Sequence, residues 1–376
     1  MKNDTLLVST GARPSRVLRL FAITTLAAGS MALPRPAAAQ SILPLPAPQA
    51  STVPANGDVN PYGVAFVPAS APTDGTLKHG GILVSNFNNS ANLQGTGTTI
   101  VQILPGGETS LFFTSTQSGL TGMTAALGIL SNGIVLAGYL PSTDGTFQTA
   151  GTGGIFVIDR KGVLLGKLND PTVFTGPWGM AVNDPGDGMA QVYVSNVETG
   201  TVVRLDVAYA AGGESLKLLK SVTVGSGFQF MGDPAAFEVG PSGLAYDAAQ
   251  DVLFVASEVD SAVYAIAGAS ALTASAGTGT QVYQDLTHLH GPLDLALLPN
   301  GHLLVANSDG HNSDPNQPSE LVEFSGDGQF VSQFSVDPNN GGAFGLAINP
   351  LGGKFIRVAA VDDNQNTLNM WITVVR

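Results

Sequence analysis

The sequence has no cysteine in 376 residues, so a protein built from it must hold its fold without disulfides. Charged residues are also scarce, at 11% of the chain against roughly 25% in typical domains. Glycine, in contrast, is abundant at 47 residues. Little charge, much Gly and many Val, Leu and Ala are typical of a sheet-rich protein with numerous tight turns.

Basic residues are few, and the formal net charge of the whole chain is −13. The first 39 residues contain five of the 15 basic residues and one of the 28 acidic residues, so the remaining chain carries 10 basic and 27 acidic residues, or −17. Such a surface repels phosphate backbones and anionic lipid heads. The composition therefore excludes nucleic acid as an expected partner, and negative charge is sufficient to keep an exported protein soluble.

The N-terminus has the three parts of a secretory signal peptide. Arg13, Arg16 and Arg19 precede the apolar run 20–33, and an Ala-x-Ala sequence ends at Ala39. We expect residues 1–39 to be a signal peptide and the mature protein to be periplasmic or extracellular. The apolar run is shorter than the roughly 20 residues of a membrane span, and no later stretch is long enough, so no span is expected after cleavage.

A Gly/Pro turn followed by a short apolar strand recurs six times, and repeats of this kind indicate the architecture. The clearest copy is Gly176-Pro177-Trp178-Gly179-Met180-Ala181-Val182. The other copies occupy residues 60–66, 121–127, 240–246, 291–297 and 342–348. Each copy precedes further short runs rich in β-branched residues, which are typical of strands.

The spacing of these copies predicts an all-β fold, a six-bladed β-propeller. The repeated Ala lies at positions 65, 126, 181, 245, 296 and 347, at intervals of 61, 55, 64, 51 and 51 residues. Three or four antiparallel strands in each interval are typical of propeller blades. The last copy ends after its third strand at Arg376, so we expect residues 58–376 to form the propeller. The Pro/Ala-rich segment 40–57, around Ser51-Thr52-Val53, is expected to supply the strand that completes the last blade and closes the ring.

The repeated turn and strands resemble NHL-repeat propellers, whose units read roughly Pro-x-Gly-(apolar)-Ala. The resemblance covers residues 60–376 and implies a broad superfamily of propellers that also includes gluconolactonase- and paraoxonase-like enzymes and amidating lyases. One feature differs from the NHL pattern. Its second strand usually ends in an acidic residue, whereas three of the strands here end in Asn86, Asn196 and Asn307.

Candidate site residues lie where the copies of the turn disagree, because these turns crowd around the channel of a propeller. His290 and Asp294 are candidate catalytic residues, since an Asp beside a His can orient a general base. The alternative is a polar turn in which the carboxylate accepts bonds from backbone N–H groups. The candidate binding residues at the channel mouth are Asn60, Trp178, His288, His290, Asp294 and Phe344. For the aromatic residues among them, packing between blades is the alternative.

The resemblance also raises the question of a metal. Amidating lyases gather zinc-binding histidines at the axis, but only one of the six turns offers a histidine. Lactonases hold calcium through Glu, Asp and Asn, and the six turns contain only Asn60 and Asp294 of these types. A second calcium candidate is the loop with Asp309, Asp314 and Glu320, which has the end spacing of a twelve-residue calcium loop but lacks its glycine. No cofactor is predicted, and calcium or zinc remains an alternative.

Two functions follow from this interpretation. The favoured one is an exported, monomeric, NHL-like propeller that binds a protein, peptide or glycan and is not an enzyme, because no complete catalytic set of residues is present. The alternative is a metal-assisted hydrolase or lyase, lactonase-like or amidating-lyase-like, with its site at the central channel.

Overall fold

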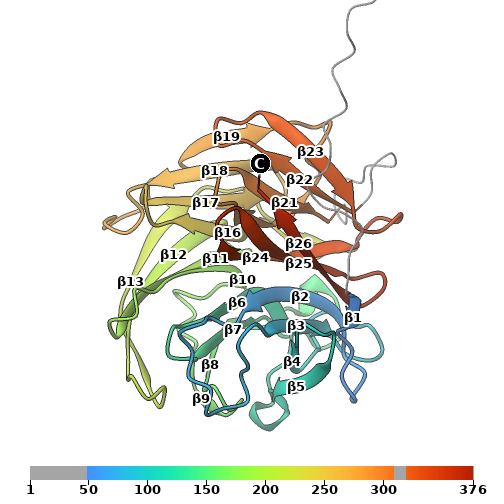
Figure 1. Cartoon of the computed structure of the whole chain (residues 1–376), viewed down its shortest axis with the longest axis vertical. Coiled ribbons are helices and arrows are strands. Elements are labelled where there is room, and N and C mark those ends of the chain that lie inside the picture. The colour runs from blue at the N-terminus through green and yellow to red at the C-terminus, as the bar shows by residue number, and fades with distance from the viewer. Residues whose placement is uncertain (1–48, 309–318, 376) are drawn as a thin grey trace, which may run out of the picture. The chain divides into compact units, whose positions relative to one another are not determined.

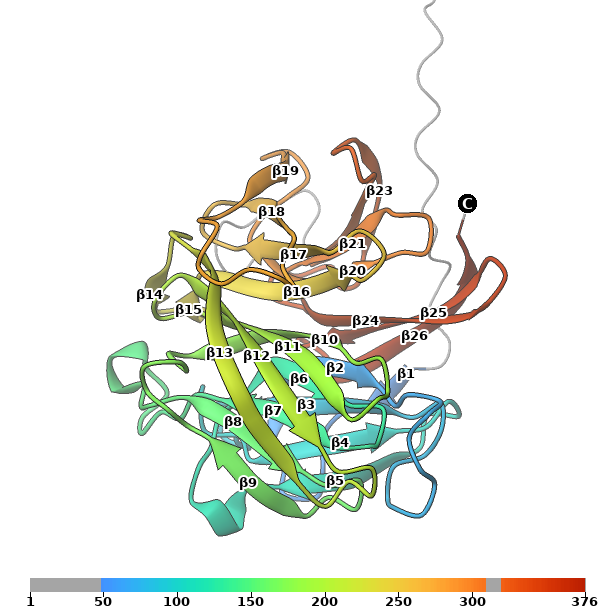
Figure 2. The same ribbon diagram turned by 90° about the vertical axis from the view of Figure 1, so that its left-hand side faces the viewer.

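The computed structural model describes residues 49–308 and 319–375, and it shows a six-bladed β-propeller (Figures 1 and 2). The expected signal peptide, together with Asp309 and Asp314, lies outside the described residues. Within them the only helices are two short 3-10 turns, η1 (Thr116–Ser118) and η2 (Phe147–Thr149). None of the described helices has the length and apolar character that a membrane span requires.

Each blade is a four-stranded antiparallel sheet, and the first strand of each blade lies innermost. Blade 1 consists of β2 (Val59–Phe66), β3 (Ile82–Asn88), β4 (Thr99–Ile103) and β5 (Thr109–Thr114). Blade 2 consists of β6 (Met123–Ile129), β7 (Val135–Tyr139), β8 (Gly154–Ile158) and β9 (Leu164–Leu168). Blade 3 consists of β10 (Pro177–Asn183), β11 (Met189–Asn196), β12 (Thr201–Tyr209) and β13 (Leu216–Ser226). Blade 4 consists of β16 (Pro241–Asp247), β17 (Val252–Ser257), β18 (Ala262–Ala267) and β19 (Thr280–Gln284). Blade 5 consists of β20 (Pro292–Leu297), β21 (Leu303–Asn307), β22 (Glu320–Phe324) and β23 (Phe330–Ser335). Blade 6 consists of β24 (Ala343–Gly352), β25 (Phe355–Asp362), β26 (Thr367–Val374) and β1 (Gln49–Ser51). A hairpin of β14 (Met231–Asp233) and β15 (Phe237–Val239) lies between blades 3 and 4.

The predicted ring closure is confirmed. The innermost strands contact one another in the cycle β2, β6, β10, β16, β20, β24, and β24 contacts β2 again. Strand β1 pairs antiparallel with β26 on the outside of blade 6, with Ala50 opposite Leu368. Because β1 comes from the N-terminal side of blade 1 and β26 from the C-terminal end, this pairing joins the two ends of the ring.

Apolar side chains fill the space between neighbouring blades. Each of six buried clusters combines strands of two adjacent blades, and a seventh lies on the axis. The Val-, Ile- and Leu-rich runs of the second and third strands supply most of these residues, because both faces of a blade are covered. This packing explains how a chain without disulfides buries a large core.

The repeated turn places the innermost strands very close together. Each innermost strand has a bulge at this turn, for example between Pro61 and Val64. A side chain at Gly63 would place its Cβ 2.8 Å from the carbonyl oxygen of Ala125 in the next blade, and Gly179 would meet Ser242 in the same way. The repeated glycine is therefore required by close approach of backbones. Its φ is not in the left-handed region.

Serine and asparagine side chains hold these turns in place. The Ser195 hydroxyl accepts a hydrogen bond from the Gly179 N–H (2.8 Å) and donates one to the carbonyl of Ser242 in blade 4 (2.6 Å). The Asn196 amide accepts from the Thr175 N–H (3.1 Å) and donates to the Val173 carbonyl (2.9 Å). The asparagine at the end of the second strand thus holds the loop that enters the innermost strand.

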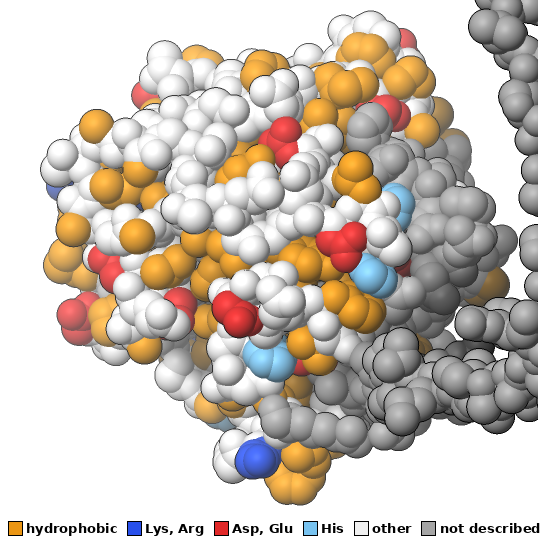
Figure 3. Space-filling view, turned by 90° about the horizontal axis from the view of Figure 1, so that it is seen from above, with side chains coloured by type: hydrophobic (Ala, Val, Ile, Leu, Met, Phe, Trp, Pro, Cys, Tyr) orange, Lys and Arg blue, Asp and Glu red, His pale blue; other side chains and the backbone are white. Residues whose placement is uncertain are grey.

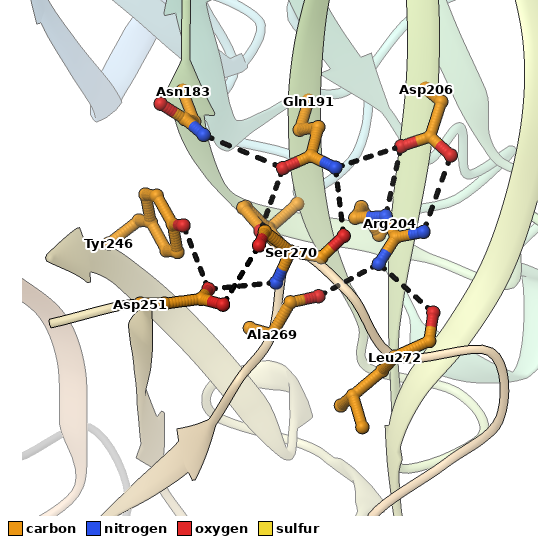
Figure 4. A network of polar contacts seen from close by, with 10 residues as sticks. Asn183, Gln191, Arg204, Asp206, Tyr246, Asp251, Ala269, Ser270 and Leu272 are labelled. Atoms are coloured by element: carbon orange, nitrogen blue, oxygen red, sulfur yellow. Dashed lines mark hydrogen bonds and ion pairs between the residues drawn. The ribbon is translucent and has the colours of Figure 1, made fainter. Parts of the chain in front are cut away.

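A buried polar network joins blades 3 and 4 away from the channel (Figure 4). Arg204 forms an ion pair with Asp206 (2.9 Å) and donates to the carbonyls of Ala269 (2.8 Å) and Leu272 (3.0 Å). Asp251 of blade 4 accepts hydrogen bonds from the Ser270 N–H and hydroxyl, both at 2.8 Å. These bonds satisfy the buried Arg204 guanidinium, whose side chain is only 4% exposed.

Candidate functional site

The centre of the ring is filled by aromatic side chains. Tyr62, Trp178 and Phe344 occupy the same position of the repeated turn in blades 1, 3 and 6, and Phe87 and Phe237 join them. The Tyr62 ring lies 5.2 Å from Phe87, 5.5 Å from Trp178 and 4.8 Å from Phe344, measured between ring centroids. This cluster gives the centre of the ring an apolar floor.

A cavity of about 220 Å³ lies above this floor, and we call it the cup. Its walls come from loops that enter innermost strands and loops that join second to third strands, in blades 1, 4, 5 and 6. The cup is lined by Asn60, Tyr62, Asn88, Asn92, Gln94, Ala235, Ala236, Glu258, Ser308, Gly341, Phe344, Asp363 and Asn364. This wall is rich in amides and carboxylates, and none of the described lining residues is Lys, Arg or His.

Three buried oxygens of the cup have no hydrogen-bond partner among the described residues: Asn60 Oδ1, Asn88 Oδ1 and Glu258 Oε2. Their side chains are 8%, 2% and 1% exposed. The Asn88 amide donates to Asn92 Oδ1 (2.7 Å), and the Asn60 N–H donates to Asn366 Oδ1 (2.8 Å), so both residues are held while their oxygens stay unpaired. Since buried polar atoms are almost always paired, these three indicate a binding site.

Three ionisable groups that line the cup, Glu258, Asp363 and Tyr62, have raised pKa values. Burial raises the pKa of the Glu258 carboxyl well above its usual value; the charge of Asp233 adds to this, and a hydrogen bond to Ser308 opposes it. Burial, followed by the charge of Asp362, raises the pKa of Asp363 to about 7. Burial raises the pKa of Tyr62 well above its usual value, and the charges of Glu258 and Asp363 add to this rise.

The donor set of the cup fits a hard cation. Among the described residues no cluster of three or more His, Cys, Asp or Glu could hold a metal, so a metal here would need amide oxygens as well as the two carboxylates. Ca²⁺ accepts such ligands and takes six to eight oxygens, whereas zinc prefers His and Cys. The residues present therefore fit calcium better than zinc.

Three of the grooves on the described surface are larger than the cup, at about 490 to 570 Å³. One of them, which includes Met189 and Leu219, lies beside the network of Figure 4. None of the buried unpaired polar atoms of the described residues belongs to these grooves. We therefore place the candidate site in the cup.

A short cap covers part of the cup. The turn of the β14–β15 hairpin contributes Ala235 and Ala236 to the wall, and Gln94 of blade 1 donates a hydrogen bond to the Ala235 carbonyl (3.0 Å). Phe237 anchors the hairpin: its φ is 68°, and its ring stacks on Trp178 with centroids 6.5 Å apart. The cap therefore bridges blades 1 and 4 across the mouth of the channel.

The structure brings only two of the predicted channel-mouth residues to the cup. Asn60 and Phe344 line it, whereas Trp178 is fully buried in the aromatic floor. His288 interacts with Asp285 and stacks on Phe330, outside the cup. On the face of the molecule shown in Figure 3, histidine side chains lie close to acidic ones, while Lys and Arg are sparse.

His290 and Asp294 do not form a pair in the cup. The His290 N–H donates to Asn307 Oδ1 (3.0 Å), which fixes this turn as Asn196 fixes its own. The Asp294 carboxylate accepts from the N–H groups of Leu295 (2.9 Å) and Leu346 (2.8 Å). Burial raises the pKa of Asp294 to about 7, although these two bonds oppose the rise. Asp294 thus links blade 5 to blade 6, as the repeated serines link other blades.

The predicted twelve-residue calcium loop is described only at its end. Glu320 is buried at the start of β22, where it accepts a hydrogen bond from Asn307 Nδ2 (3.0 Å). Asp309 and Asp314 lie outside the described residues.

The sequence did not point to two cup residues, Asn88 and Glu258, and it indicated Asp363 only as part of the polar turn 362–364, for which a solvated turn was the favoured interpretation. Each comes at the end of a second strand or directly after it, in the loop to the third strand. The catalytic and binding candidates lie in or beside the turns that enter the innermost strands, and only the calcium candidates lie in loops to a third strand. The available signal was a polar residue immediately past the second strand, since these loops open on the same end of the channel.

Comparisons with known proteins concern the fold. No protein-family model and no curated protein matches the chain. Regucalcin from Agrobacterium tumefaciens, a calcium-binding protein, matches with a TM-score of 0.50 and 14% identity over 86% of this chain and 94% of its own. An inactive variant of virginiamycin B lyase from Staphylococcus aureus (TM-score 0.47, 11% identity, 87% and 99% covered) and a gluconolactonase from Xanthomonas campestris (0.40, 12%, 88% and 98%) match less well. At 14% identity the likeness to regucalcin shows a shared fold alone.

Proposed function

We propose that the cup binds a divalent cation of the calcium type and that the protein is a cation-assisted hydrolase of small uncharged molecules, lactonase-like in kind. The observation that carries this proposal is the set of three buried oxygens without partners, on Asn60, Asn88 and Glu258, residues that line one cavity together with Asp363. Unpaired buried oxygens are costly in a fold unless a ligand completes them.

The residues of the cup divide into two groups in this proposal. Asn60, Asn88, Glu258 and Asp363 would hold the cation, which when bound would polarise a carbonyl oxygen of the ligand. The amides of Asn92, Gln94 and Asn364 line the same cavity and can orient a ligand by hydrogen bonds. The aromatic floor supplies the apolar side of the cavity.

Two features favour a lactonase-like enzyme over an amidating-lyase-like one. No histidine is among the described residues that line the cup, so these residues offer no nitrogen ligand to zinc. The described residues that line the cup include no Lys or Arg to pair with a carboxylate or phosphate group, and this favours an uncharged ligand. Regucalcin, a calcium-binding protein, shares the fold, and this likeness goes no further.

A binding role for a protein, peptide or glycan partner is the second candidate. It is favoured by exposed apolar side chains on the loops around the mouth: Leu93, between two cup residues, and Phe230 and Met231 at the start of the cap. Under both proposals the protein is exported and monomeric.

Calorimetric titration of the purified, chelator-treated mature protein with CaCl₂ tests the cation site. We expect one equivalent to bind, and Glu258→Gln to lower the affinity at least about 100-fold. Glu323→Gln is the matched control, since Glu323 is also buried but is paired with His302 (2.7 Å) and Ser332 (3.2 Å). No binding by the wild type, or equal effects of the two variants, would rule the proposal out.

A further inference from the structure

Tyr62 is the only tyrosine among the described residues that line the cup. The Tyr62 side chain is only 4% exposed, and its ring is packed against Phe87, Trp178 and Phe344. A tyrosine with a packed ring and a polar tip at a cavity wall is placed to use its hydroxyl as a hydrogen-bonding group toward a bound ligand.

The position of Tyr62 is set by the fold and not by the flexibility of its side chain. The bulge between Pro61 and Val64 turns the residue toward the axis, and Gly63 lets β2 approach blade 2 closely enough to keep it there. Three aromatic neighbours then restrict the ring. Tyr62 is therefore a rigid donor, which loses little conformational entropy when it binds a ligand.

The cup also limits what such a ligand can be. A volume of about 220 Å³ admits a small molecule but no folded partner, and the carboxyls of Glu258 and Asp363 are acidic neighbours of the Tyr62 hydroxyl. A tyrosine hydroxyl at neutral pH is protonated, so it can donate to an acceptor oxygen. An uncharged carbonyl oxygen is an acceptor that these acidic neighbours do not repel.

We propose that Tyr62 is a substrate-binding residue whose hydroxyl donates a hydrogen bond to the carbonyl oxygen of a small uncharged ester or lactone in the cup. This inference rests on the proposed function and adds to it the residue that recognises the reacting carbonyl. A donor so placed strengthens its bond as negative charge develops on that oxygen. The neighbouring ring of Phe344 supplies an apolar surface but no donor.

The test compares Tyr62→Phe with the wild type and with Tyr139→Phe, all as full mature chains. Tyr139 is a buried tyrosine of blade 2 that does not line the cup, so its variant is the matched control for loss of a phenol hydroxyl. Three quantities are measured: calcium affinity by calorimetry, kcat/KM for δ-valerolactone in the presence of calcium, and affinity for δ-valerolactam, the amide analogue. Thermal melting checks that each variant is folded.

We expect Tyr62→Phe to keep the calcium affinity and the melting temperature of the wild type while kcat/KM and lactam affinity fall about 10-fold or more. Tyr139→Phe should leave both probe measurements unchanged. Unchanged probe values in Tyr62→Phe would overturn the inference and leave the cation site standing, as would a calcium-bound wild type that neither hydrolyses the lactone nor binds the lactam. A wild type that binds no calcium would instead contradict the proposed function itself.

Discussion

The network between blades 3 and 4 and the cup at the channel mouth are both polar and largely buried, but they differ in how their groups are paired. In the network of Figure 4, Arg204, Asp206 and Asp251 each find partners on the neighbouring strands or loop. In the cup, oxygens of Asn60, Asn88 and Glu258 lie buried without one. The first arrangement stabilises the ring, whereas the second leaves acceptors open for a ligand at a cost in stability.

The same comparison separates Asp294 from Glu258. Both are acidic, lie near the axis and have raised pKa values. Asp294 accepts two backbone hydrogen bonds that join blades 5 and 6, while Glu258 Oε2 has no partner. A raised pKa alone therefore does not distinguish a structural carboxyl from a candidate ligand, and hydrogen-bond pairing does.

The largest expected effect is on the network. Arg204→Met should lower the free energy of unfolding by about 3 kcal/mol, because it leaves Asp206 without its ion pair and the Ala269 and Leu272 carbonyls without a donor. Urea unfolding followed by circular dichroism measures this. Arg357→Met, which removes one bond to the Gly80 carbonyl (3.2 Å), should cost less than 1 kcal/mol. Equal losses in the two variants would contradict the special role of the network.

The next effect concerns the pH dependence of the cation-free protein. The pKa of Asp363 is raised to about 7 in the folded state, above an unfolded value near 3.9, so its contribution to stability is present below about pH 4 and is lost as the pH rises to 7. In EDTA, Asp363→Asn should therefore gain about 2 kcal/mol relative to the wild type between pH 4 and 7, a figure reduced for partial exposure. If the free energies of unfolding of the two proteins change in parallel with pH, the pKa of Asp363 is not raised in the folded state.

A smaller effect is expected at Asp294. Asp294→Ala should lower the free energy of unfolding by about 1.5 kcal/mol, because the Leu295 and Leu346 N–H groups lose their acceptor. Calcium affinity should stay within a factor of about two, because Asp294 does not line the cup. Loss of calcium binding in this variant would return Asp294 to the candidate site.

The smallest expected effect has opposite signs for Glu258 in the cup and for Glu323 outside it. Without calcium, Glu258→Gln should raise the free energy of unfolding by about 1 kcal/mol, because it removes a buried carboxyl that has an unpaired oxygen. Glu323→Gln should lower it by a similar amount, since Glu323 loses its pairing with His302. Differential scanning calorimetry in EDTA measures both. Shifts of the same sign would mean that the buried carboxyl of Glu258 does not lower the free energy of unfolding of the calcium-free protein.

Parts of the site followed from the repeated turn, and other parts did not. Asn60 and Phe344 were predicted at the channel mouth because they lie in the turns that enter the innermost strands, and both line the cup. Trp178 shares that turn but packs into the floor, since its larger ring reaches the axis between Tyr62 and Phe87. Glu258 and Asp363 come from the other set of loops, and no periodicity marks a single polar residue there.

The sequence by itself determined the number of blades, their order and the closing strand, because bulge-forming turns and β-branched runs recur at regular intervals and act locally. Only the tertiary structure decided which polar residues face one another in the cup. Asn60, Glu258 and Asp363 are up to 303 residues apart, and closure of the ring brings their loops to one end of the axis. Whether a buried oxygen is paired there depends on neighbours from other blades, and local sequence does not encode that.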